Sequence, residues 1–111
     1  MKKSILIVGG SISGLAAALV LASAKNAELD FDISIVDDGK ADLNVVAIYN
    51  VPLFPKGIVG KDIIEQTRKQ IDALLKVSYI SGTINEISGS KGAFVGSGES
   101  VSVKADYVVL A

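Results

Sequence analysis

The chain has 111 residues, half of them hydrophobic, with 11 basic and 12 acidic residues and a net charge of −1. This length fits a single domain with a core of its own, and the balanced charge argues against a nucleic-acid-binding surface. The sequence has no cysteine and no histidine, which excludes disulfides, thiolate or histidine metal ligands and Ser-His-type triads. Any redox chemistry would therefore have to come from a bound cofactor.

The first 24 residues predict a strand, a glycine turn and a helix. Residues 4–8 (SILIV) form an apolar run typical of a strand buried on both faces. Residues 15–24 are rich in Ala and Leu and apolar nearly all round, which predicts a buried helix. The same stretch also looks like a signal peptide, with two lysines, an apolar run and an A-x-A ending. That alternative explains residues 1–24 only, and the apolar run is too short to span a bilayer.

A second strand completes a βαβ unit. Residues 25–30 are a polar connection, and residues 31–36 alternate and then run apolar up to Asp37-Asp38-Gly39. Such a unit is expected to be right-handed, with its two strands parallel. The sequence thus favours the α/β class with a mostly parallel sheet.

The rest of the chain predicts one more helix and a run of short strands. Residues 40–60 are expected to be a loop with local structure, in which residues 50–57 contain both prolines and are extended. Residues 61–75 predict an amphipathic helix. Its apolar stripe consists of Ile63, Ile64, Thr67, Ile71, Leu74 and Leu75, and its polar face of Glu65, Arg68, Lys69 and Asp72. Strands are expected at residues 77–80 and 106–111, with short β segments at 83–87, 93–95 and 100–103 forming a small meander between them.

The glycine turn is the main candidate for a binding site. It consists of Gly9, Gly10, Ser11, Ile12, Ser13 and Gly14. In the G-x-G-x-x-G pattern, the glycines permit a tight turn, close approach of the backbone to a pyrophosphate, and helix-on-strand packing. The phosphate then lies on the free amides of the helix N-terminus. Here Ser11 replaces the second glycine, and its hydroxyl is a further potential donor. The alternative is an ordinary strand-to-helix connection.

An acidic residue at the end of the second strand strengthens this interpretation. Asp37 follows Gly14 by 23 positions, close to the separation of about 20 that is typical of a ribose-binding carboxylate. Its charge would disfavour a 2′-phosphate, which argues against NADP at this site. Asp38 is the second candidate. The alternative for either residue is a solvated turn at a strand end, and we prefer Asp37 for the ribose.

Five segments in order resemble a known family. VGGSISGLAAALVLASA, IVDDG, YNVPLFPKGIVGKDIIEQTRKQI, SGTINEI and ADYVVLA look like the FAD-binding half of thioredoxin-reductase-like pyridine nucleotide-disulfide oxidoreductases. The resemblance extends from Ser4 to Ala111 and implies a Rossmann-like FAD/NAD(P)-binding fold. It places the FAD pyrophosphate on residues 9–14 and the adenosine ribose on Asp37. It also implies that Asn50 lies close to the flavin.

The resemblance implies two further contacts and shows several departures. The backbone of Ile84 would meet the adenine, and Ala111 would open an Ala-Thr-Gly turn beside the cofactor. Ordinary roles as strand core for Ile84 and as a turn residue for Asn50 remain open. Leu53 stands where the family often has glycine. The second glycine motif for NAD(P)H, the Cys-x-x-Cys and the later Gly-Asp motif do not occur in these residues. Residues 1–111 are therefore expected to be the first portion of an FAD-binding domain, without the NAD(P)H domain and the C-terminal FAD segment.

Three functions follow as expectations. The first is an FAD-dependent, NAD(P)H-using oxidoreductase or its FAD-binding fragment, in which no side chain of this chain is a catalytic acid or base. The second is a non-catalytic nucleotide-binding module or a subunit that needs a partner chain. The third is a small secreted protein that begins near Lys25. Under the first, we expect a cytoplasmic protein that contacts neither nucleic acid nor membrane and associates as a homodimer or through exposed sheet surface.

Overall fold

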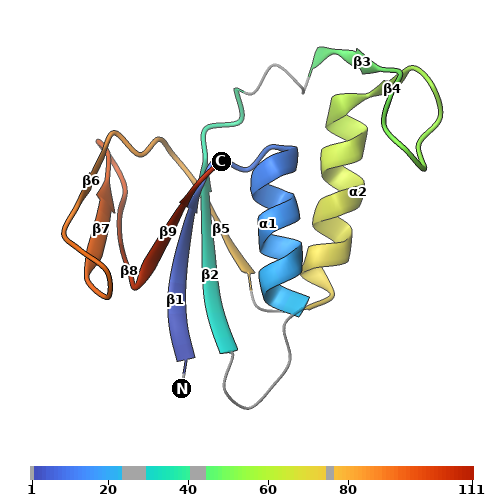
Figure 1. Ribbon diagram of the computed structural model, residues 1–111. Coiled ribbons are helices and arrows are strands. Elements are labelled where there is room, and N and C mark those ends of the chain that lie inside the picture. Colours follow the sequence, from blue (N-terminus) through green and yellow to red (C-terminus); the bar gives the residue numbers. More distant parts are fainter. Residues whose placement is uncertain (1, 24–29, 41–44, 75–76) are drawn as a thin grey trace.

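A four-stranded parallel sheet in the order β5-β2-β1-β9 forms the centre of the molecule. Figure 1 shows the chain as a computed structural model, which describes residues 2–23, 30–40, 45–74 and 77–111. The strands are β1 (Lys2–Val8), β2 (Asp30–Asp37), β5 (Val77–Ser81) and β9 (Tyr107–Leu110). All three neighbouring pairs are parallel. The predicted α/β class with a mostly parallel sheet is confirmed.

Two helices lie side by side on one face of this sheet (Figure 1), α1 (Ile12–Ser23) and α2 (Gly60–Asp72). Successive strand residues point to opposite faces, so β1 sends Ile5 and Ile7 toward the helices and Leu6 away from them. The buried residues of the helix-side core are Ile5, Ile7, Leu15, Ala18, Ala22, Ile33, Ile35 and Ile71. The continuous apolar runs in β1 and β2 therefore reflect burial on both faces.

The expectation that α1 is buried nearly all round is wrong for one side. Val20 is 71% exposed, and Ala16 is exposed as well. A helix on the outside of a layered arrangement buries only the side that meets the sheet and its neighbouring helix. α1 begins at Ile12, earlier than expected, and the expected helix ends at Ala24 and Leu75 lie outside the described residues. Within the described part of the chain, neither helix has the length and apolar character needed to cross a membrane.

A small antiparallel meander covers the other face of the sheet. It consists of β6 (Glu86–Ser88), β7 (Phe94–Ser97) and β8 (Ser102–Ala105). A Cβ atom on Gly96 would lie 2.5 Å from Leu6 Cδ2, which shows how closely β7 approaches the sheet. The meander is confirmed, but its first strand begins after Ile84. That residue packs instead beside the small core cluster of Leu6, Val36 and Ala105.

The segment expected to be a loop at 40–60 contains a short hairpin. β3 (Ala47–Ile48) and β4 (Ile58–Val59) pair in antiparallel fashion. The Gly57 N–H donates to the Ile48 carbonyl oxygen at 2.7 Å, and the Gly60 N–H donates to that of Val46 at 2.8 Å. Strands of two residues are too short to produce an alternating pattern in the sequence, which is why the hairpin itself was not predicted. The hairpin projects beyond the N-terminus of α2 (Figure 1).

A carboxylate fastens the start of β9 to β1. The Ser4 N–H and hydroxyl donate to Asp106 Oδ2 at 2.8 and 3.1 Å, and the Asp106 N–H donates back to the Ser4 carbonyl oxygen at 3.0 Å. The donation from the Ser4 backbone is the main reason why the pKa of Asp106 lies below its usual value. β9 is an edge strand, and Leu110 is 75% exposed.

Candidate nucleotide site

The glycine turn lies at the carboxyl edge of the sheet, between β1 and α1. Gly9 has a φ of +107°, which side-chain-bearing residues rarely adopt, and its N–H donates to the Val36 carbonyl oxygen at 2.9 Å. A Cβ atom on Gly9 would also lie 2.6 Å from the carbonyl oxygen of Ala111. Both the backbone conformation and the passage of Ala111 therefore require glycine at this position.

Gly14 allows α1 to begin directly against the turn. Gly14 is buried, and a Cβ atom there would overlap the Gly9 carbonyl oxygen and lie 2.9 Å from the Gly9 carbonyl carbon. The first helical hydrogen bond runs from the Leu15 N–H to the Ser11 carbonyl oxygen at 3.0 Å. The amides of the first turn of a helix have no partner within the helix, and that turn here carries no acidic residue. The start of α1 is thus suited to an anion.

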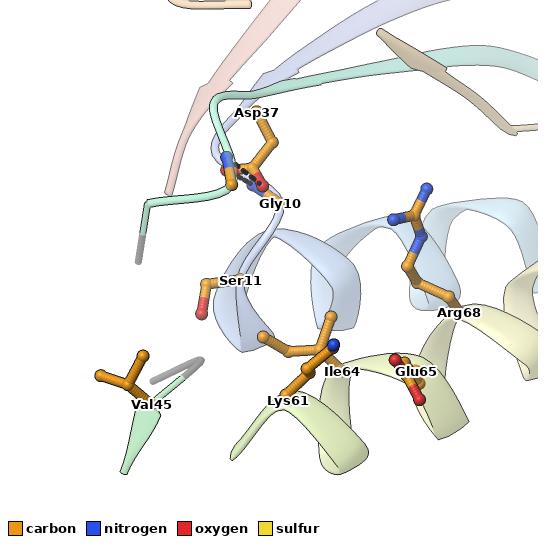
Figure 2. A pocket seen from close by; sticks show the side chains of 9 residues that line it. Gly10, Ser11, Asp37, Val45, Lys61, Ile64, Glu65 and Arg68 are labelled. Carbon is orange, nitrogen blue, oxygen red and sulfur yellow. Dashed lines mark hydrogen bonds between the residues drawn. The ribbon is translucent and has the colours of Figure 1, made fainter. Parts of the chain in front are cut away.

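Asp37 lies against the same turn. Its Oδ1 accepts the Gly10 N–H at 3.1 Å and its Oδ2 accepts the Gly39 N–H at 3.2 Å (Figure 2). Asp38, by contrast, is exposed and accepts the Lys40 N–H at 2.9 Å in a local turn. The fold therefore brings one of the two candidate carboxylates to the glycine turn and leaves the other in solvent.

A cavity of about 410 Å³ opens beside these residues. Figure 2 shows the turn and Asp37 on one side of it and α2 on the other. The lining residues are Gly10, Ser11, Asp37, Gly39, Val45, Lys61, Ile64, Glu65 and Arg68. Another cavity, of about 460 Å³ and more apolar, lies at the other end of β1 and β2, and no predicted site residue lines it.

The contribution of α2 to this cavity was not predicted. Glu65 and Arg68 were assigned to the polar outer face of the helix, yet both line the cavity while remaining exposed. The Arg68 guanidinium also lies 3.9 Å from the centroid of the Tyr79 ring, a cation–π contact. The one signal in the sequence was the spacing of residues 61, 64, 65 and 68, which places them on one side of a helix.

Of the remaining predicted site residues, Ala111 lies beside the turn, whereas Ile84 and Asn50 do not line the cavity. The Ala111 N–H donates to the Val8 carbonyl oxygen at 3.0 Å, which places Ala111 beside Gly9. Ile84 is half-buried in the core under the meander. Asn50 is exposed between β3 and β4 and does not line the described cavity. Among the described residues, no group of three or more acidic side chains is placed to hold a metal ion.

The sequence and fold of the chain are similar to those of known proteins. No family model matches the sequence. Thioredoxin reductase 2 of Arabidopsis thaliana is 30% identical over 112 aligned positions, which cover 98% of this chain and 29% of that protein. An oxidoreductase from Agrobacterium tumefaciens superposes with a TM-score of 0.80 at 28% identity over 99% of this chain and 36% of its own. The chain has a thioredoxin-reductase-like sequence and fold.

Other solved structures agree with this result. A thioredoxin reductase from Gloeobacter violaceus has a TM-score of 0.81 at 22% identity, a likeness in fold that covers 98% of this chain and 36% of that one. The resemblance inferred from the five sequence segments is confirmed, as is the Rossmann-like fold with a small meander. The thioredoxin-reductase-like chain spans about a third of the length of these relatives.

Proposed function

We propose that this chain is the FAD-binding portion of an NAD(P)H-dependent, thioredoxin-reductase-like oxidoreductase. The observation that carries the proposal is the meeting of the glycine turn, the start of α1 and the Asp37 carboxylate at one edge of the sheet. These groups match the two polar parts of a dinucleotide, its pyrophosphate and its ribose. The similarity to thioredoxin reductases supports FAD as that dinucleotide. Residues 1–111 would form a first portion of the FAD-binding domain.

The residues of this chain would bind and orient the cofactor. The amides of residues 11–14 and the Ser11 hydroxyl would hold the pyrophosphate, and Gly9 and Gly10 let the backbone approach it. Asp37 would accept hydrogen bonds from the adenosine ribose. When bound, FAD would supply the transfer of hydride and electrons, since the chain has no histidine or cysteine.

Three further predicted contacts belong to the same proposal. Ala111 lies beside the turn and is suited to a backbone contact with the cofactor. The exposed Asn50 would reach the flavin from the β3–β4 hairpin, and the backbone of Ile84 would meet the adenine. Each assignment rests on the family resemblance.

The proposed cofactor is tested by titrating the purified chain with FAD and following flavin fluorescence. Gly9→Val should abolish binding, because the turn cannot form with a side chain at this φ. Gly92→Val is the matched control, since Gly92 also has a positive φ of +89° but lies in the meander. Asp37→Ala should weaken binding by about 1.5–3 kcal/mol, the usual value of hydrogen bonds to a charged group. Asp38→Ala should leave it unchanged.

The outcomes separate the candidate functions. Wild-type affinity in Asp37→Ala would show that the ribose assignment is wrong. Failure of the wild-type chain to bind FAD would contradict the proposed cofactor. Bleaching of the bound flavin by NADH or NADPH would indicate a complete oxidoreductase, whereas FAD binding without bleaching is the result expected of an FAD-binding portion.

We also propose that copies of the chain associate through the open edge of the sheet, in a cytoplasmic protein. β9 has no neighbouring strand on its outer side among the described residues, and Leu110 is largely exposed there. Light scattering after size exclusion should give a mass above that of one chain. A monomer across the accessible concentration range would count against association.

A further inference from the structure

The Asp37 carboxylate joins the glycine turn to the backbone that follows β2 by two hydrogen bonds. Its Oδ1 accepts the N–H of Gly10, which lies 27 positions earlier in the chain, and its Oδ2 accepts the N–H of Gly39. Gly10 is buried, so its amide would lack a partner if the carboxylate were removed. A buried amide without a partner is costly, which makes this bond important for the turn itself.

The backbone of Asp37 is held firmly by the sheet. The parallel pairing of β2 and β5 ends with Asp37 opposite Ser81, and the Gly82 N–H donates to the Asp37 carbonyl oxygen at 3.0 Å. The side chain therefore extends from a fixed point of the sheet to the glycine turn. On the turn, the Gly9 N–H is bonded to Val36, the residue before Asp37. The end of β2 thus holds two successive amides of the turn.

The packing around Gly10 leaves no room for a side chain at this position. A Cβ atom on Gly10 would lie 2.9 Å from Asp37 Cβ and 3.2 Å from Ile35 Cγ2. The turn therefore lies directly on the end of β2, where the Gly10 N–H donates to Asp37 Oδ1. This contact therefore requires glycine at position 10.

We infer that Asp37 is a positioning residue for the glycine turn and that it couples the ribose and phosphate halves of the nucleotide site. The coupling rests on the proposed function, whereas the positioning of the turn does not. Each carboxylate oxygen has two lone pairs and accepts one N–H here, so capacity remains for ribose hydroxyls. A nucleotide would therefore meet a carboxylate that is already oriented and a turn that is already held.

The first test needs no ligand. Amide hydrogen exchange of Gly10, measured by NMR, should be about tenfold or more faster in Asp37→Ala than in wild type, as expected for loss of a charge-assisted hydrogen bond. Asp37→Asn should retain most of the protection, because its amide oxygen still accepts the Gly10 N–H. The central β1 amide of Ile7 should not change in either variant. Unchanged exchange at Gly10 in Asp37→Ala, or an equal rise at Ile7, would overturn the inference.

The second test uses inorganic pyrophosphate, which has no ribose. If Asp37 acted on the ribose alone, removing its negative charge should strengthen pyrophosphate binding equally in Asp37→Ala and Asp37→Asn. If it positions the turn, the Ala variant should bind pyrophosphate several-fold more weakly than the Asn variant, although both are neutral. Equal Kd values in the two variants would overturn the coupling. If neither pyrophosphate nor FAD binds the wild-type chain, the proposed function fails, and the exchange experiment still decides the positioning role.

Discussion

Gly14→Ala distinguishes helix propensity from tertiary packing at the proposed site. Gly14 lies within the first turn of α1, where alanine would by itself stabilise the helix by about 1 kcal/mol. The structure predicts the opposite sign. The new methyl group would overlap the Gly9 carbonyl oxygen and lie 2.9 Å from its carbon and 3.4 Å from Ile7 Cγ2. Because two of these atoms belong to backbone, the contact is relieved only if α1 moves away from the turn.

Such overpacking costs about 1–3 kcal/mol when side chains can adjust. Because the methyl group would meet backbone atoms, which cannot adjust as side chains do, we expect a cost at or above the upper limit of this range. After the gain in helix propensity is subtracted, the net loss of stability should be about 2 kcal/mol or more. Urea unfolding followed by far-UV circular dichroism measures this loss as a shift in midpoint at constant slope. Ser13→Ala, at the exposed neighbouring position, is the control and should stay within about 0.5 kcal/mol of wild type. Gly14→Ala as stable as wild type, or more stable, would refute the close approach of α1 to the turn.

Three further variants test features outside the turn. The lowered pKa of Asp106 means that its bonds with Ser4 stabilise the fold at neutral pH and are lost as the pH falls below the usual value of 3.8. Asp106→Ala should therefore remove part of the acid dependence of Tm, and parallel Tm–pH curves would contradict this. Leu53 is fully exposed with a φ of +72°, so Leu53→Gly should stabilise by about 0.5–1 kcal/mol in urea unfolding; a loss of stability would exclude strain there. The Tyr79 hydroxyl is buried and has no hydrogen-bond partner in the described part of the chain, although the Asp72 and Arg68 side chains lie close enough to influence its pKa. Tyr79→Phe should therefore leave stability unchanged or raise it by up to about 1 kcal/mol, and a lower thermal midpoint would show that one of these side chains bonds the hydroxyl.

The position of Leu53 shows how a departure from a family pattern can be understood. The sequence alone identified Leu53 as a residue where the family often has glycine. The structure gives this residue a left-handed backbone conformation, which glycine adopts without strain. Leu53 therefore occupies a backbone conformation that glycine would adopt more readily.

Several features of the fold were not visible in the sequence. The β3–β4 hairpin has strands of two residues, which carry no periodic signal. The exposure of Val20 depends on which side of α1 faces the sheet, and an apolar helix gives no indication of that side. The approach of Arg68 to the cavity depends on how α2 packs beside α1, a contact between segments about 50 positions apart in the sequence.

The sequence by itself determined the order along the chain of both helices and of the strands other than β3 and β4, the glycine turn and the acidic end of β2. These are local properties, since apolar runs, glycines and a strand-terminal carboxylate act within a few residues of their own positions. Only the tertiary structure decided that Asp37 rather than Asp38 meets the turn, that its carboxylate holds the Gly10 amide, and that Ala111 covers Gly9. Those contacts join residues 27 to 102 positions apart, and they exist because parallel pairing brings the carboxyl ends of β1, β2 and β9 to one edge of the sheet.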